Sequence, residues 1–283
     1  MIISNTSITN PESLILKESR SIISERPIGE LLQKSLTSTP CVNVRKNAKV
    51  RVVAGMLVQY LETFTDSVVV RDNTTPIGVI GGKEIIQGVY KNPSSDFFEM
   101  NLVEDIADNR LTKIIPDTTL KELISLCRDS GRAFAVINTN NDDYSVVSAK
   151  KLLEIGMSYN SEFYISQIPK KNTVMFNKDA TFGDVMGSML KNKSRKLLLE
   201  GTHQLINDRI IIEIIENFNY LLDTSNFLQI PVSIATLDDA KVVSEDLKLS
   251  QISKIMYDMS HPCVIYEDQV ITPWDICTAL GKN

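Results

Sequence analysis

The sequence predicts an α/β fold of the α+β type, built from four β-α-β-β-α repeats that pair into two modules. The first observation is that the same order of strands and helices recurs four times along the chain. The second is that the closing strands of the repeats, at Val79, Val146, Leu205 and Val270, lie 67, 59 and 65 residues apart. The third is the length of 283 residues, which suggests two domains if each holds ~150 residues. Self-similarity at a nearly fixed period is typical of repeated structural units.

Each repeat is predicted to open with a short strand, followed by an amphipathic helix, a two-stranded hairpin and a closing helix. The hairpins are predicted by paired apolar runs on either side of a polar turn such as "YEDQ". The acidic pairs Asp142–Asp143 and Asp238–Asp239 are expected in turns. The first repeat has a longer helix and a longer hairpin loop. Apolar residues three and four positions apart predict the opening helices of repeats two to four: Leu120, Leu123, Ile124 and Cys127; Phe182, Val185, Met186 and Met189; Leu249, Ile252, Ile255 and Met256.

A single repeat cannot bury the apolar face of its own sheet, so the repeats are expected to pack in pairs, sheet against sheet. Polar stretches at 91–101 and 154–163 indicate the break within the first pair and the break between the pairs. The predicted boundaries are 1–27 for an N-terminal extension, 28–153 for the first pair (repeats about 28–92 and 102–153) and 164–282 for the second (repeats about 164–222 and 227–282).

The composition limits the classes of function. Apolar residues make up 43% and charged residues 23% of the chain, as in a globular rather than a disordered protein. The net charge of −5 makes nucleic acid an unlikely partner, because nucleic-acid affinity depends on neutralising phosphates. Two histidines and four scattered cysteines predict neither a metal site nor a disulfide framework. Without a signal peptide or an apolar run of ~18 residues, a cytoplasmic location without membrane contact is expected.

The C-terminal stretch "VITPWDICTAL" contains a Thr-x-x-Asp pair, Thr272 and Asp275, directly before an apolar run. Such a pair, with Pro273 at the first helical position, is typical of a helix N-terminus. The same atoms can also bind a ligand. A helix N-terminus attracts phosphate, and a carboxylate offers two acceptors that match a vicinal diol. Capping and binding use the same groups, so both interpretations stay open.

In this context the chain resembles tandem cystathionine-β-synthase (CBS) domain proteins, with four repeats in two Bateman modules over about residues 28–282. The resemblance rests on the repeat order and on the family motif G-h-h-T-x-x-D, where h is apolar. The fourth repeat has this motif as "QVITPWD", with Gln269 at the glycine position. The layout is similar to that of the gamma subunit of AMP-activated protein kinase and of archaeal stand-alone CBS proteins. The resemblance implies a non-enzymatic regulatory protein that binds an adenosine-containing ligand: AMP, ADP, ATP or S-adenosylmethionine.

The resemblance also implies roles for individual residues. The Thr272 hydroxyl would contact a phosphate, and the Asp275 carboxylate would accept hydrogen bonds from both ribose hydroxyls. The family places a basic residue just before the second strand of each repeat, and Arg195 and His261 occupy comparable positions. These four residues are the predicted ligand site, in the cleft between repeats three and four. No catalytic residue, catalytic cofactor or metal ligand is expected.

The other three repeats depart from the motif. A glutamate can still bind a diol, so a possible second site comprises Glu84, Ser148 and Arg132, the last lying one residue from the basic position. At the threonine and aspartate positions the sequence has Gly81 and Glu84 in repeat one, Ser148 and Lys151 in repeat two, and Asn207 and Ile210 in repeat three.

Two alternative functions remain at this point. The chain could be a ligand-free protein-interaction scaffold with degenerate sites or, as a weaker alternative, a nucleic-acid-binding protein. Besides the adenosyl ligand, the possible partners are a second copy of the chain in a homodimer or a regulated effector protein.

Overall fold

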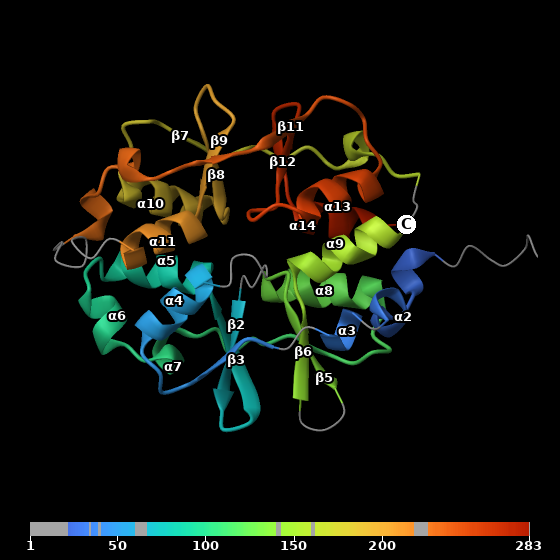
Figure 1. Cartoon of the computed structure of the whole chain (residues 1–283), viewed down its shortest axis with the longest axis horizontal. Helices are drawn as coiled ribbons and strands as arrows, with labels where there is room; N and C mark the ends of the chain where they lie inside the picture. Colours follow the sequence, from blue (N-terminus) through green and yellow to red (C-terminus); the bar gives the residue numbers. More distant parts are fainter. Residues whose placement is uncertain are drawn as a thin grey trace, which may run out of the picture.

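The computed structural model describes residues 22–33, 35–38, 41–59, 67–139, 143–159, 162–217 and 226–282. Within these residues the β-α-β-β-α order occurs four times, and each repeat has its own small sheet. The first two repeats form the lower half of the view in Figure 1 and the last two form the upper half. The longer helices of the repeats lie toward the boundary between the halves, and the sheets point outward. The predicted fold class is therefore confirmed.

The first module contains repeats one and two. Before its first strand lie the short helices η1 (Ile23–Glu25), α2 (Ile28–Leu32) and α3 (Ser35–Ser38). Repeat one comprises β1 (Asn43–Arg45), α4 (Val50–Gln59), β2 (Ser67–Asp72), β3 (Thr75–Gly81) and α5 (Gly82–Lys91). The connecting helices are α6 (Asp96–Met100) and α7 (Val103–Ile106). Repeat two comprises β4 (Lys113–Ile114), α8 (Leu120–Ser130), β5 (Ala135–Thr139), β6 (Asp143–Val147) and α9 (Ala149–Ser158).

The second module contains repeats three and four. After η3 (Ile165–Gln167), repeat three comprises β7 (Met175–Phe176), α10 (Phe182–Asn192), β8 (Lys196–Leu199), β9 (Gln204–Asn207) and α11 (Asp208–Asn217). The turns η4 (Phe227–Gln229) and η5 (Val232–Ile234) lead to β10 (Asp238–Asp239). Repeat four comprises β11 (Lys241–Val243), α13 (Leu249–Tyr257), β12 (Val264–Tyr266), β13 (Gln269–Ile271) and α14 (Pro273–Leu280).

The central strand of each repeat has buried residues on both faces. In every repeat the first strand pairs in parallel with the second, which pairs antiparallel with the third. Because successive strand residues point to opposite faces, Val68 and Val70 of β2 pack among the helices. Val69 of the same strand packs against Phe134 and Val136 of repeat two. The repeats of a module therefore meet sheet to sheet, as expected.

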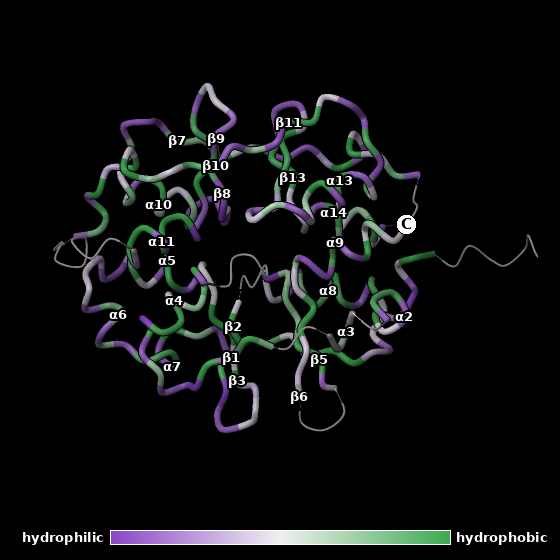
Figure 2. The backbone as a smooth tube through the Cα atoms, viewed as in Figure 1, coloured by the Kyte–Doolittle hydropathy of each residue, from purple (hydrophilic) through white to green (hydrophobic). Residues whose placement is uncertain are grey.

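The helices join the two modules. Helices α4 and α5 of repeat one pack on α10 and α11 of repeat three, and α9 of repeat two packs on α13 and α14 of repeat four. One large apolar cluster thus combines repeats one and three, and another combines repeats two and four with the segment from Ile23 to Leu36. Figure 2 shows apolar residues concentrated on these central helices.

Gly156 of α9 is required by this helix packing. A β-carbon at this position would lie 2.2 Å from Ser253 Oγ of α13 and 3.3 Å from a methyl carbon of Ile276 in α14. We expect Gly156→Ala to lower the free energy of unfolding by about 1–3 kcal/mol, because the helices must separate to admit the methyl group. Gly55→Ala in α4 is the control, since nothing lies within 4 Å of the added carbon there. It should raise stability by about 0.5–1 kcal/mol. Denaturant unfolding of both variants measures the difference, and stabilisation by both would contradict this account of the packing.

Three details differ from the sequence expectations or go beyond them. Asp238 and Asp239 form β10, which pairs antiparallel with β9 of repeat three, so the prediction of a turn there is wrong. Asp143 begins β6, whereas Asp142 lies outside the described residues. Helix α9 continues to Ser158, beyond the expected end of the second repeat at 153. The domain boundaries themselves stay predictions.

Candidate functional site

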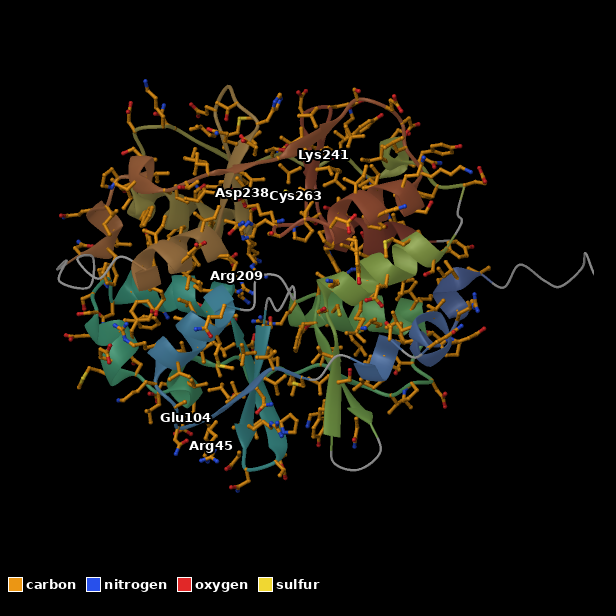
Figure 3. All side chains as sticks on the ribbon, viewed as in Figure 1. Arg45, Glu104, Arg209, Asp238, Lys241 and Cys263 are labelled. Carbon is orange, nitrogen blue, oxygen red and sulfur yellow. The ribbon has the colours of Figure 1, made fainter. Side chains whose placement is uncertain are left out.

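A cavity of about 480 Å³ lies between the two modules, and all four repeats contribute to its wall. The wall is strongly basic. Among the described residues that line it, the only carboxylate is Asp208. The lysines and arginines of the wall are Lys83, Arg128 and Arg132 from the first module and Lys171, Lys193, Arg195, Lys196 and Arg209 from the second. Figure 3 shows Arg209 close to the boundary between the modules.

Five of these eight cations have polar partners within the protein. Arg132 and Arg195 pair with the carboxylates of Glu84 and Asp208, and Lys171 pairs with Asp275. Lys196 donates to the Pro262 carbonyl at 2.7 Å, and Arg209 donates to the Leu57 carbonyl at the end of α4. The side chains of Lys83, Arg128 and Lys193 form no ion pair or hydrogen bond with any other described residue. These last three side chains are therefore available to an anion.

Thr272 and Asp275 form the expected helix start. The Thr272 N–H donates to Asp275 Oδ2 at 2.8 Å, and the Thr272 hydroxyl donates to the same oxygen at 2.6 Å. The aspartate half of a capping box is therefore present, but the Thr272 hydroxyl accepts no hydrogen bond from the first N–H groups of the helix. Thr272 lines the cavity, whereas Asp275 lies just behind the wall with 14% of its side chain exposed.

Lys171 contacts Asp275 although the sequence did not indicate it. Its Nζ atom lies 2.5 Å from Asp275 Oδ2. The segment before β7 reaches this position because Thr173 Oγ1 donates to the Asp268 carbonyl at 2.9 Å and accepts from the Val270 N–H at 3.2 Å. All three hydrogen bonds to the Asp275 carboxylate end on Oδ2, so none of the described residues donates to Oδ1.

Arg195 and His261 both line the cavity, as does Thr272. Arg195 Nε donates to Asp208 Oδ2 at 2.5 Å. His261 Nδ1 lies against the Asp238 carboxylate of β10, so its contact is with the strand that extends the sheet of repeat three. The other ring nitrogen, Nε2, is buried and has no hydrogen-bond partner among the described residues. The structure therefore brings Thr272, Arg195 and His261 to one cavity, with Asp275 next to it.

Glu84 and Arg132 form a buried pair in the first module. Arg132 donates to Glu84 Oε1 at 2.6 Å and to Ser67 Oγ at 2.8 Å, while Glu84 Oε2 accepts the Gly81 N–H at 2.9 Å. Both carboxylate oxygens thus have internal donors. Ser148 precedes α9 and is buried, but it does not line the cavity. The structure therefore brings Glu84 and Arg132 of the possible second site together, but it does not bring Ser148 to them.

In repeat two, the segment at Ser35 and Leu36 lies against the residue at the aspartate position of the motif. Lys151, at the aspartate position of the motif, donates to the backbone carbonyl of Ser35 and to its hydroxyl, the latter at 2.8 Å. Ser145 Oγ donates to the carbonyl of Leu36, whose side chain is buried. A lysine suits this occupant because carbonyl oxygens need donors, whereas ribose hydroxyls need acceptors.

The sequence could have indicated some of the missed cavity residues. Arg128 and Lys193 both lie at the C-terminal end of the opening helix of their repeats, four residues before Arg132 and two residues before Arg195. Superimposing the repeats would have shown this shared basic region. Asp208 and Lys171 had no such signal, because their roles depend on contacts between distant segments.

Two further properties of the described residues bear on function. No group of three or more His, Cys, Asp and Glu side chains is placed to hold a metal ion in the ranges that the structure describes. In the same ranges, every helix is too short or too polar to cross a bilayer.

Comparison with solved structures identifies the fold. No family model matches the sequence, and no curated protein matches it. A Methanocaldococcus jannaschii protein, described as a candidate archaeal homologue of γ-AMPK, superimposes with a TM-score of 0.72 at 13% identity, over 89% of this chain and 99% of that one. An uncharacterized conserved protein from Pyrococcus horikoshii has a TM-score of 0.56 at 13% identity, over 88% and 99% of the two chains.

A shorter similarity is found with a CBS-domain protein from Pyrobaculum aerophilum that was crystallised with AMP. It covers 44% of this chain and 89% of that one, at 20% identity and a TM-score of 0.35. The four repeats, their sheet-to-sheet pairing and the agreement over nearly the whole chain lead to one conclusion: the chain has the fold of a tandem CBS-domain protein with four repeats.

Proposed function

We propose that the chain is a non-enzymatic regulatory protein that binds an adenosine-containing nucleotide in the cleft between repeats three and four. The ligand's phosphates would enter the central cavity, and its ribose would reach Asp275. The observation that carries the proposal is the cavity wall. Eight lysines and arginines from repeats one, two and three line it, with a single carboxylate among the described lining residues. Concentrated positive charge beside a helix N-terminus favours phosphate groups.

The proposed ribose contact uses the free side of the Asp275 carboxylate. Oδ2 is engaged by Thr272 and Lys171, and Oδ1 receives no donor from the described residues. A ribose diol that displaces Lys171 would have both oxygens as acceptors, and the released Lys171 would lie beside the phosphates. Lys171 has 41% of its side chain exposed, so this movement needs no repacking of the core.

The absence of catalysis is part of the proposal. Burial raises the pKa of the Cys41 thiol to about 11 and also raises the pKa of Cys277. Neither thiol therefore has the low pKa that a nucleophilic cysteine needs. A cytoplasmic location and assembly as a homodimer, or with an effector protein, belong to the same proposal.

The test is a calorimetric and thermal-shift titration with AMP, ADP, ATP and S-adenosylmethionine. Ligand at one hundred times its Kd should stabilise the protein by about 2.7 kcal/mol. Asp275→Asn should weaken binding by roughly ten- to a hundredfold, because the amide has only one acceptor oxygen for the diol.

Asp184→Asn is the matched control for this substitution. Asp184 caps α10 through Thr181 with the same two hydrogen bonds, both 2.8 Å long, and it does not line the cavity. If neither variant alters affinity, Asp275 only caps α14. If none of the four ligands binds, the ligand-free scaffold becomes the better interpretation. Steeply salt-dependent binding of random oligonucleotides would instead favour the nucleic-acid alternative.

A further inference from the structure

Asp208 is an acidic residue in an otherwise basic environment. It is the first residue of α11 and is only 3% exposed. Among the described residues of the cavity wall, it contributes the one carboxylate. Its Oδ2 atom accepts from Arg195 Nε at 2.5 Å. Arg195 belongs to the ligand site that the family resemblance implies. A carboxylate of the protein therefore already occupies one side of its guanidinium.

The same carboxylate lies against a helix of the other module. A β-carbon on Gly82, the first residue of α5, would be 2.0 Å from Asp208 Oδ2 and 2.5 Å from Asp208 Cγ. Only glycine allows this approach. The N-terminus of α5 carries partial positive charge, which stabilises a nearby anion. In repeat one the motif hydroxyl is also missing, because Gly81 stands where repeat four has Thr272.

We propose that Asp208 is a tethered competitor for the anionic group of the ligand. In the structure the carboxylate holds Arg195 and the N-terminus of α5, two features that would otherwise attract a phosphoryl oxygen. A bound phosphate takes over Arg195, and Asp208 moves away from the incoming charge. This inference rests on the proposed function only in requiring an anionic ligand, and it does not require adenosine.

The competition would couple ligand binding to the arrangement of the modules. Asp208 belongs to the second module and Gly82 to the first, and α11 packs on α5 across the boundary. A ligand that displaces the carboxylate changes this contact. Binding would then favour a different module arrangement, because the two states differ in affinity for the anion.

The experiment compares pyrophosphate, AMP and adenosine binding to the wild type and to Asp208→Asn by titration calorimetry. The amide keeps the shape of the side chain and removes its charge. Pyrophosphate and AMP should bind at least about tenfold more tightly, because a like charge within a few ångströms of the phosphate is removed. Any affinity for adenosine should stay unchanged.

Glu213→Gln is the matched control. It removes the same charge from the same helix, at a half-exposed position that does not line the cavity. It should change pyrophosphate affinity less than twofold. If both variants tighten binding equally, net charge explains the gain, and the competitor role is wrong. Weaker binding by Asp208→Asn would also overturn it, since Asp208 would then position Arg195 for the ligand.

Gly82→Ala provides a second variant that changes no charge. Its methyl group cannot coexist with the carboxylate, so Asp208 must leave α5, and pyrophosphate should again bind more tightly. No gain in this folded variant would contradict the proposal even if Asp208→Asn fails to fold. The proposed nucleotide function is tested separately. One outcome is that pyrophosphate affinity rises in the variants as expected while AMP binds no more tightly than pyrophosphate. That result would support the competitor role of Asp208 and contradict an adenosine-containing ligand.

Discussion

Replacing Arg132 by methionine is expected to lower the free energy of unfolding by about 3–5 kcal/mol. Arg132 and Glu84 are 8% and 5% exposed in their side chains, so both charges have lost most of their water. Three hydrogen bonds compensate for this burial. Arg132 donates to Glu84 at 2.6 Å and also to Ser67, and the Gly81 N–H donates to Glu84. Arg132→Met removes the cation and leaves the Glu84 carboxylate buried without its partner, which is the costly case for an ion pair. Denaturant unfolding at neutral pH measures the loss.

Two further variants test whether the loss comes from leaving one buried charge unpaired. Arg132→Met combined with Glu84→Met removes both charges and should recover most of the stability, because apolar residues can replace a buried pair at little cost. Arg110→Met is the matched control. Hydrogen bonds from Arg110 lower the pKa of Asp108 to about 2, but Arg110 is 65% exposed and solvent screens the pair. The control should therefore cost less than about 1 kcal/mol. An equally small loss in Arg132→Met would show that burial does not strengthen the Arg132–Glu84 pair.

Neutralising Lys83, Arg128 and Lys193 together should weaken nucleotide binding by about a thousandfold. These cations come from repeats one, two and three, line one cavity and have no carboxylate partner in the described chain. A charge-assisted hydrogen bond contributes roughly 1.5–3 kcal/mol. Three such bonds at the lower figure exceed the ~4 kcal/mol that corresponds to a thousandfold change in Kd. Calorimetric titration of ATP into the triple glutamine variant measures the effect.

The control for the triple variant is a second set of three lysines. Lys91, Lys178 and Lys241 are exposed and do not line the cavity, so their replacement by glutamine changes net charge equally. It should reduce affinity only slightly, by an amount that disappears at high salt. Equal losses in the two triple variants would mean that the cavity is not where the phosphates bind.

The repeat pattern predicted the fold without a matching family model. Element order and spacing depend on local sequence: the apolar face of α8 and the capping pair Thr119–Glu122 are visible in ten consecutive residues. The helix start at Thr272 and Asp275 was predictable for the same reason, since both partners lie within one turn. Asp238 and Asp239 show the limit of this reasoning. Acidic residues favour turns, but pairing with β9 decided their conformation.

The sequence by itself therefore determined the repeats, their sheet-to-sheet pairing within each module and the helix start at Thr272 and Asp275. Only the tertiary structure decided which of those residues already have partners. Lys171 and Asp275 are 104 positions apart, and Lys151 and Ser35 are 116 apart. The packing of α5 on α11 places Asp208 beside Gly82, although nothing near either residue indicates it. The physical reason is that periodicity specifies that a helix has an apolar face but not which helix will cover it. The charged side chains at the ends of those helices acquire their neighbours only when distant segments of the chain pack together.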